Sequence, residues 1–265
     1  MYIHNLDPNF IDLGFFQLKW YSIAYILGIL LGWYLGKKII LHQEINSITK
    51  IKFKEFDDFI TFAIISLIIG GRLGYVLFYN LGYYLQNPFE IIKIWEGGMS
   101  FHGGLLGVIV GAYIFRRSKN IQLIYILDIV SCVAPIGLFF GRIANFINSE
   151  LYGKPTEFFL GVVFPQVDNL IRHPSQLYEA FLEGLLLLII LNYLIFKKIY
   201  NQGYASSLFL ILYGIFRIFA EQFREPDEQI GYILNLFSMG SILSFAMILF
   251  GMIIFVKIKN NTINE

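Results

Sequence analysis

The chain is poor in charge, cysteine and histidine, and each shortage excludes a class of protein. Charged residues make up 15% of its 265 residues, against about 25% in a typical soluble domain. The formal net charge is only +1, which excludes the broad positive surface of a nucleic-acid-binding protein. We therefore expect no nucleic acid among its partners.

The sequence has few of the residues that usually bind metals or cofactors. Cys132 is the single cysteine, so an intrachain disulfide and a thiolate metal cluster are both excluded. The four histidines are His4, His42, His102 and His173. Their spacing does not match a zinc site, and the sequence contains no phosphate-binding loop, dinucleotide fingerprint or G-x-S-x-G elbow. The sequence predicts no metal and no cofactor.

Long hydrophobic runs take the place of these residues. Hydrophobic residues make up 57% of the chain, and several runs reach the roughly 20 apolar residues that cross a bilayer. We predict an all-α polytopic membrane protein with seven transmembrane helices, forming a single membrane domain over residues 1–265. The predicted spans are Phe15–Lys37, Phe59–Tyr79, Met99–Phe115, Ile121–Phe140, Gln176–Phe196, Tyr204–Glu221 and Leu234–Val256.

The distribution of lysine and arginine predicts the orientation. Twelve of the twenty basic residues fall in one set of loops: Lys37, Lys38, Lys50, Lys52, Lys54, Arg116, Arg117, Lys119, Lys197, Lys198, Lys257 and Lys259. Five fall in the opposite set: Lys19, Lys93, Lys154, Arg172 and Arg224. The excess of positive charge marks the cytoplasmic side. We expect a periplasmic N-terminus and a cytoplasmic C-terminus.

The outer face carries more than short turns. Gly82–Glu96 predicts a short interfacial arm helix, with Tyr83, Tyr84 and Trp95 suited to the headgroup region. A longer segment, approximately 141–175, separates spans four and five. Its "YGKPT" and "VVFPQ" runs indicate turns and short strands. We expect this segment to form a small periplasmic cap.

Glycines recur at four-residue spacing in three of the spans. They are Gly28, Gly32, Gly36, Gly70, Gly74, Gly103, Gly107 and Gly111. This spacing is typical of close packing between membrane helices, and we interpret most of them so. Gly103 and Gly104 are the exception, because their missing side chains beside His102 also favour access for a lipid headgroup.

Charged side chains inside a bilayer cost a few kcal/mol each on insertion scales, so they mark function. Eight titratable residues lie in the spans or at their ends: Arg72, His102, Asp128, Arg142, Glu179, Glu183, Arg217 and Glu221. Most can be placed in the outer half of the membrane. On a helix, Arg142, Asn145 and Ser149 share a face, and Arg217 and Glu221 are i, i+4 neighbours. An interfacial helix end and a structural ion pair remain the alternatives.

Arginines at headgroup depth suit phosphate, since a guanidinium matches phosphate oxygens in bidentate geometry. Four segments carry a closer likeness: "SFHGGLLG", "GRIANFINSELYG", "RHPSQLYEA" and "YGIFRIFAEQFREPD". Together they resemble the prolipoprotein diacylglyceryl transferase family of bacteria. The resemblance implies a seven-helix enzyme of the bacterial inner membrane. Such an enzyme transfers diacylglyceryl from phosphatidylglycerol to the lipobox cysteine in the signal peptide of a prolipoprotein, forming a thioether and releasing glycerol phosphate.

The resemblance also implies roles for the polar residues. His102 is a candidate base for the acceptor thiol; alternatively it orients substrate while Arg142 or Arg217 supplies a positive field. Arg142 and Arg217 would stabilise the departing phosphate, and Glu221 would orient Arg217. The resemblance assigns seven residues to substrate binding: Tyr25, Arg72, Gly103, Gly104, Asn145, Glu150 and Gly153. A transporter of a lipid or anionic solute, and a structural assembly factor, are the competing interpretations.

Overall fold

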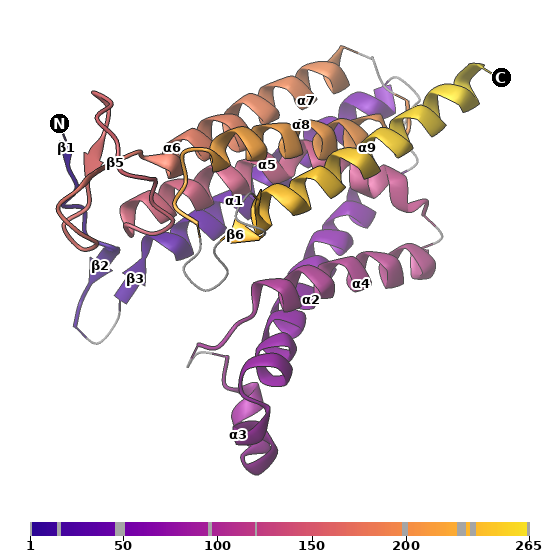
Figure 1. Ribbon diagram of the computed structural model, residues 1–265. Coiled ribbons are helices and arrows are strands. Elements are labelled where there is room, and N and C mark those ends of the chain that lie inside the picture. The colour runs from indigo at the N-terminus through magenta and orange to yellow at the C-terminus, as the bar shows by residue number, and fades with distance from the viewer. Residues whose placement is uncertain are drawn as a thin grey trace. The chain divides into compact units, whose positions relative to one another are not determined.

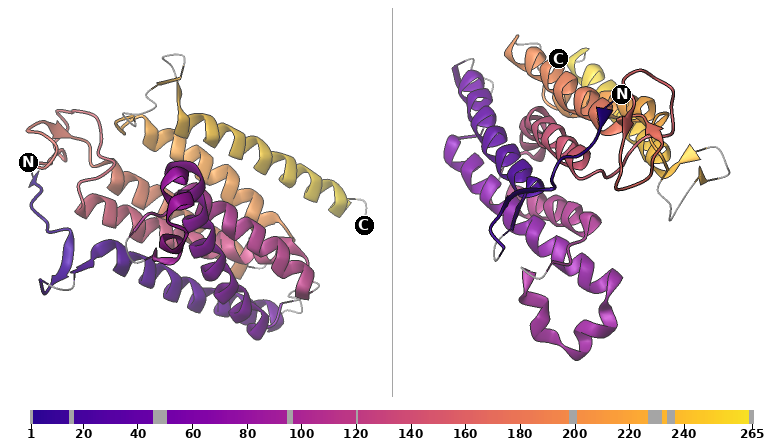
Figure 2. Two further views of the ribbon diagram at one scale, coloured as in Figure 1. Left: turned by 90° about the horizontal axis from the view of Figure 1, so that it is seen from below. Right: turned by 90° about the vertical axis from the view of Figure 1, so that its left-hand side faces the viewer.

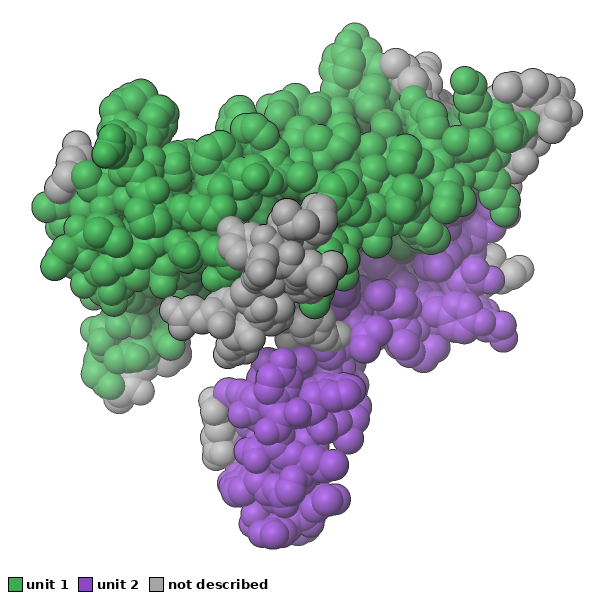
Figure 3. All heavy atoms as spheres, viewed as in Figure 1, with its two compact units in different colours: residues 1–42, 127–265 green, residues 43–126 purple. Residues whose placement is uncertain are grey.

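A computed structural model describes residues 2–14, 17–45, 51–94, 97–119, 121–197, 201–226, 232–233 and 237–263 (Figure 1). The chain divides into two compact units, shown in different colours in Figure 3. Unit 1 comprises Met1–His42 and Leu127–Glu265, and unit 2 comprises Gln43–Ile126. Helices dominate both units, which confirms the predicted all-α class. That the two units form one membrane domain stays a prediction.

Within the described residues, six helices are long and apolar enough to cross a membrane. They are Trp20–Gln43, Phe53–Tyr79, Leu123–Ile147, Ser175–Phe196, Tyr204–Glu221 and Met239–Asn260. Each coincides with a predicted span, so the polytopic membrane class is confirmed. The third predicted span is also helical, as α4 (Phe101–Lys119), but it is not among the six, because its glycines and terminal basic residues make it less apolar. The count of seven spans is therefore not confirmed. Phe15 and Leu234, where two predicted spans begin, lie outside the described residues.

Unit 1 is a bundle of long helices. Its elements are α1 (Trp20–Ile45, whose last turn belongs to unit 2), α5 (Leu123–Ile147, which enters from unit 2), α6 (Ser175–Glu179), the π-helical η3 (Ala180–Leu186), α7 (Leu187–Phe196), α8 (Tyr204–Glu221) and α9 (Met239–Ile263). α8 and α9 lie side by side in Figures 1 and 2. Gly28 of α1 meets Gly137 of α5, where an added Cβ would come within 3.2 Å of the Gly137 Cα. The glycine-packing prediction is confirmed for this pair.

Short strands gather at one end of unit 1. β1 (Tyr2–Ile3), β4 (Val162–Val163) and β5 (Ile171–Arg172) form a three-stranded sheet in the order β1-β4-β5, with β1 parallel to β4. Two hairpins join them at this end: β2 (Asn9–Asp12) with β3 (Gln17–Lys19), and β6 (Tyr232–Ile233) with β7 (Phe237–Ser238). The predicted strands of the 141–175 segment are confirmed. However, α5 continues to Ile147, so the irregular part begins later than expected. We call residues 2–14 and 148–174 the cap.

Unit 2 is an antiparallel pair of helices with a short appendage. α2 (Phe53–Tyr79) packs along α4, and α3 (Leu81–Gln86) and η1 (Pro88–Ile92) follow α2. The short helix predicted within Gly82–Glu96 is therefore confirmed; Trp95 and Glu96 lie outside the described residues. Ser100 caps α4, since its Oγ accepts the backbone N–H of Gly103 at 3.2 Å.

Candidate functional site

Charged residues from α5, α6, η3 and α8 meet at the cap end of unit 1. Arg142 comes from the last turns of α5 and Glu179 closes α6. Glu183 lies in η3, and Arg217 and Glu221 lie in the last turns of α8. Together with Arg224, which follows α8, these side chains form what we call the arginine–glutamate cluster.

The cluster is centred on one carboxylate. Glu179 Oε2 lies 2.7 Å from Arg142 Nε, and Glu179 Oε1 lies 2.8 Å from Arg217 Nη1. Arg224 Nη1 lies 3.8 Å from Glu179 Oε1. Glu183 is the second bridge, at 3.4 Å from Arg142 and 3.5 Å from Arg217. Two glutamates thus hold two arginines from different helices side by side.

The predicted i, i+4 pair is present within this cluster. Arg217 Nη2 lies 2.8 Å from Glu221 Oε2. On its other side, Glu221 faces the start of α9, where an added Cβ on Gly240 would come within 3.1 Å of the carboxylate. The amino end of a helix favours a negative charge. Glu221 is therefore held between an arginine and a helix N-terminus, and not by Arg217 alone.

The arginine and glutamate side chains of the cluster differ in their exposed fractions. The Glu179 and Glu183 side chains are fully buried, whereas 16% of the Arg142 side chain and 10% of Arg217 remain exposed. Arg217 Nη1 itself is buried against Glu179 and donates no hydrogen bond. Because, of these four residues, only the arginines keep an exposed fraction, an anion that approaches from outside meets them before it meets the two glutamates.

A second polar network lies one helical turn along α5. Asn145 Nδ2 donates to the Tyr21 hydroxyl, and that hydroxyl donates to the Glu150 carboxylate. Asn145 Nδ2 also lies 3.4 Å from Glu150 Oε2. Gln176 of α6 donates to the Glu150 carbonyl at 2.7 Å. The predicted residues Asn145 and Glu150 are brought together, and α1 supplies their partner Tyr21.

The end of α5 explains how Glu150 reaches this network. The Glu150 N–H donates to the Asn145 carbonyl at 2.9 Å, and the Ser149 N–H to the Phe146 carbonyl at 3.0 Å. These two bonds define a Schellman motif, in which the residue after the helix adopts a left-handed conformation. Ser149 does so, at φ 57°. Ser149 was expected on the helical face of Arg142 and Asn145; this expectation is wrong, because the helix has already ended.

Gly153 marks a junction of three backbone segments. Its N–H donates to the His173 carbonyl at 3.0 Å, and it pairs with Arg224 in an isolated β-bridge. An added Cβ would come within 2.6 Å of the His173 Cβ and 2.7 Å of the Phe223 carbonyl. Close approach of backbones is a reason for glycine that needs no ligand. Binding of substrate by Gly153 stays a prediction.

Arg172 fastens the cap at this junction. It donates to the Gly153 carbonyl at 3.0 Å, to Glu225 at 3.0 Å and to Asp168 at 2.6 Å. The Arg172 guanidinium lowers the pKa of the Asp168 carboxyl below its ordinary value. The segment after α8, which carries Arg224 into the cluster, is thereby tied to the cap.

Arg72 has a different setting, inside unit 2. Its guanidinium donates five hydrogen bonds to backbone carbonyls of the segment that follows α3: Glu90, Ile91, Lys93, Gly97 and Gly98. A guanidinium has five N–H groups, so all of them are engaged. We infer that Arg72 couples this segment to α2, and its predicted role in lipid binding stays a prediction.

His102 and its glycines lie at the start of α4. His102 is the second residue of the helix, and its side chain lies outside the described residues. Gly103 faces α2, where an added Cβ would come within 2.8 Å of the Gly74 Cα, and Gly70 and Gly107 pack in the same way. An added Cβ on Gly104 would be in ordinary contact with Leu67, at 3.5 Å. Helix packing accounts for Gly103, and the roles of His102, Gly103 and Gly104 in the reaction stay predictions.

Sequence reasoning missed several members of the site. Tyr25 was expected at the site; it is 68% exposed and stacks on Tyr21, which makes the hydrogen bonds, and its role in substrate binding stays a prediction. Glu179 was expected only as an outer partner of the site, yet its carboxylate is the hub of the cluster. Arg224 was assigned only to a loop. The signal for Tyr21 was present in its spacing of four from Tyr25, which places both on one helix face.

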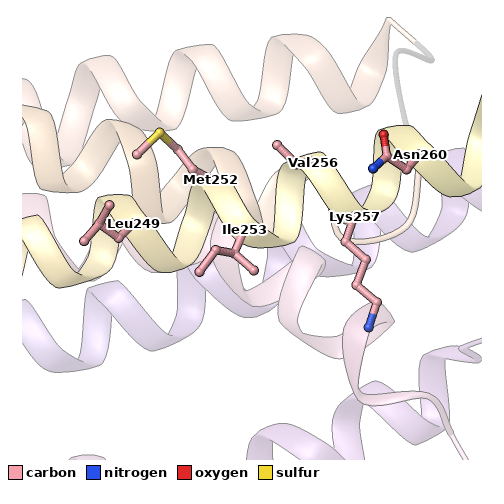
Figure 4. Close-up of a pocket in the computed structure, with 6 residues that line it drawn as sticks. All are labelled: Leu249, Met252, Ile253, Val256, Lys257 and Asn260. Atoms are coloured by element: carbon pink, nitrogen blue, oxygen red, sulfur yellow. The ribbon is translucent and has the colours of Figure 1, made fainter.

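A hollow elsewhere in unit 1 does not belong to this site. It lies along α9 and is lined by Leu249, Met252, Ile253, Val256, Lys257 and Asn260 (Figure 4). All six come from one helix, between Leu249 and Asn260, whereas Gly240, which borders Glu221, lies at its start. The chemistry is therefore expected at the cap end and not in this hollow.

The helices and the cluster together define a polytopic membrane protein with paired arginines and glutamates gathered at one end of unit 1. Comparison with known proteins gives the particular family. The prolipoprotein diacylglyceryl transferase family model matches residues 8–257, and the chain belongs to that family.

Near relatives cover almost the whole chain. A phosphatidylglycerol–prolipoprotein diacylglyceryl transferase of Rickettsia bellii is 50% identical over 263 residues, 98% of each chain. Enzymes of the same name from Rickettsia typhi and Rickettsia felis are 52% and 53% identical over 95% and 93% of this chain, and 96% and 95% of their own lengths. Membership of a transferase family favours the enzyme over the transporter.

Proposed function

We propose that this chain transfers the diacylglyceryl group of phosphatidylglycerol to the lipobox cysteine of a prolipoprotein in the bacterial inner membrane, the first step of lipoprotein maturation. One observation carries the assignment to this site: Arg142 and Arg217, from two helices, converge on the single buried carboxylate of Glu179 at 2.7 and 2.8 Å. The names of the relatives support the substrates.

The reaction forms a carbon–sulfur bond and breaks a carbon–oxygen bond. The thiolate sulfur attacks the glycerol carbon that bears the phosphate ester, and that carbon leaves with the sulfur as a diacylglyceryl thioether. The electron pair of the broken bond goes to the phosphate oxygen, so glycerol phosphate departs with additional negative charge. Arg142 and Arg217 stabilise this charge with groups already in place. The thiol proton is lost before or during attack, with His102 as base, or with His102 orienting substrate while the arginines supply the field.

The glutamates keep the arginines in place between turnovers. Two guanidinium groups side by side would repel each other in a medium of low dielectric constant. Glu179 and Glu183 offset this repulsion from the buried side. The exposed edges of the arginines then face the incoming phosphate. Asn145 lies one turn further along α5, and its hydrogen-bonded partners Tyr21 of α1 and Glu150 lie with it beside Arg142.

On the predicted orientation, this site lies on the outer face of the membrane. The basic-residue asymmetry supports a periplasmic cap and a cytoplasmic C-terminus. The prolipoprotein, phosphatidylglycerol and the bilayer are the partners on this proposal, without metal or cofactor.

Purified protein with phosphatidylglycerol and a lipobox peptide tests the proposal. We expect a thioether-linked diacylglyceryl peptide and one equivalent of glycerol phosphate, detected by mass spectrometry. The double variant Arg217→Gln, Glu221→Gln removes a balanced pair of charges and should remain folded but inactive, since Arg142 alone would meet the phosphate. No thioether from the unaltered protein, or a fully active double variant, would contradict the proposal.

A further inference from the structure

His4 lies in the cap, 145 residues before Ser149 in the sequence, yet it touches the turn that ends α5. It is 2% exposed, and its backbone N–H donates to the Val163 carbonyl at 2.9 Å. Its ring packs against Phe146 and Phe164, with centroids 5.0 and 5.3 Å apart. Its Nδ1 lies 3.2 Å from Ser149 Oγ, within hydrogen-bond distance. The sheet pairing of β1 with β4 thus delivers one buried imidazole to one serine.

That serine occupies a conformation it disfavours. Ser149 at φ 57° and Leu151 at φ 54° both lie in the left-handed region, with Glu150 between them. The left-handed position after a helix is normally filled by glycine, because a Cβ is unfavourable there. The turn nevertheless directs Glu150 to Tyr21 and Asn145. A contact that holds Ser149 therefore also holds Glu150.

We propose that His4 is a positioning residue of the transfer site: it holds Ser149 in the left-handed turn that presents Glu150 to Tyr21 and Asn145, next to Arg142. This inference rests on the proposed function. His4 acts through Ser149 and the backbone, and it touches neither lipid nor peptide.

Replacing Ser149 by glycine tests the mechanism. His4→Ala should lower kcat/KM about tenfold, equivalent to roughly 1.4 kcal/mol of activation free energy. Ser149→Gly alone should stay near the unaltered rate, because glycine adopts the turn without the help of His4. The double variant His4→Ala, Ser149→Gly should recover most of the lost rate. A normal rate for His4→Ala, or a double variant as slow as His4→Ala, would overturn the inference.

Two further variants separate this mechanism from loss of folding. His4→Phe keeps a ring between Phe146 and Phe164 but has no nitrogen for Ser149, so it should be slowed and rescued in the same way if His4→Ala folds poorly. His173→Ala removes another cap histidine, whose Nδ1 lies 3.2 Å from the Tyr178 hydroxyl. Ser149→Gly should not rescue that variant; a rescue would show general stabilisation of the cap and would overturn the inference.

Amide hydrogen exchange measures the stability of the turn independently of the transferase reaction. The Glu150 N–H, bonded to the Asn145 carbonyl at 2.9 Å, should exchange faster in His4→Ala and return to slow exchange in the double variant. If exchange follows this pattern but the unaltered protein makes no thioether, the proposed function fails while His4 still holds the turn. If the unaltered protein makes thioether but the exchange rate of the Glu150 N–H is unchanged in His4→Ala, only the inference about His4 fails.

Discussion

Among single residues, Glu179 has the contacts that connect it most directly to activity, although on our proposal it is neither a base nor a nucleophile. Its two oxygens bind two arginines from different helices. Removing the charge of a buried ion partner strands the others and costs about 3–5 kcal/mol. Glu179 thus links the stability of unit 1 to the direction of Arg142 and Arg217.

We expect Glu179→Gln to lower both the free energy of unfolding, by about 3 kcal/mol, and the transferase rate per folded molecule, by tenfold or more. Asp128→Asn is the matched control. Asp128 is also a fully buried carboxylate, but it caps α8 at the far end by accepting from Gly203 N–H at 2.6 Å and Ser206 N–H at 2.8 Å. That variant should lose about 1 kcal/mol of stability and keep its rate. Equal rates for the two folded variants would show that Glu179 is only structural.

Arg72 shows how an arginine in a membrane helix can bind backbone carbonyls rather than a ligand. Arg72→Lys keeps the charge, but an ammonium group has three donors at one point and cannot reach five carbonyls. We expect the free energy of unfolding to fall by about 2 kcal/mol, and amides of the 88–94 segment to exchange faster.

Arg116→Lys is the control for Arg72, since Arg116 stacks over the Tyr113 ring at 5.5 Å and should tolerate the change. Unchanged stability of Arg72→Lys together with a raised KM for phosphatidylglycerol would instead favour lipid binding by Arg72.

At the scale of elements, the cap is held by short strands and a few buried side chains, so its stability depends on their protonation. Burial lowers the pKa of His4 and of His173 below the ordinary value near 6.5, and the charge of Lys154 also lowers that of His173. Both histidines therefore bind a proton less readily in the folded cap than in the unfolded chain, which binds protons as the pH falls below about 6.5. Stability is therefore lost as the pH falls through and below that value.

Thermal unfolding in detergent at about pH 7.5 and about pH 5.5 measures this loss, within the range in which histidine titrates. We expect a lower melting temperature at the acidic pH, and a smaller difference in the double variant His4→Phe, His173→Phe. Asp168 does not contribute in this range, because Arg172 lowers its pKa below the ordinary carboxyl value. A melting temperature that rises on acidification would contradict a lowered pKa for these two histidines.

For the whole molecule, orientation is the property on which the chemistry depends. The cap and the arginine–glutamate cluster lie at the same end of unit 1, so the side of the membrane that holds the cap also holds the reaction. We expect Glu157→Cys, at an exposed position of the cap, to react with a membrane-impermeant thiol reagent added outside intact spheroplasts. Lys119→Cys, at an exposed site 41% accessible, should not react.

The unaltered protein is the control for labelling, because Cys132 is fully buried and should stay unlabelled. Labelling of Lys119→Cys and not of Glu157→Cys would reverse the topology and place the cluster on the cytoplasmic side.

The sequence by itself determined the membrane class, the order of the helices and the family. Hydrophobic runs predict spans because a helix in lipid must be apolar along its length, and glycine spacing predicts packing faces for the same local reason. Arg142, Arg217 and Glu221 could be chosen because charge inside a bilayer is costly and therefore conspicuous. Each of these signals lies within one helix.

The tertiary structure decided which charges meet. Glu179 and Glu183 come from one continuous helix and Arg224 from the segment after α8, and no periodicity links them to Arg142. Glu183 lies in a π-helical stretch that a 3.6-residue pattern does not describe. Tyr21 rather than Tyr25 joins Asn145 because α1 packs on α5 through Gly28 and Gly137. His4 reaches Ser149 only because a strand of two residues pairs with β4. Contacts between distant segments depend on packing geometry in three dimensions, which local sequence patterns do not encode.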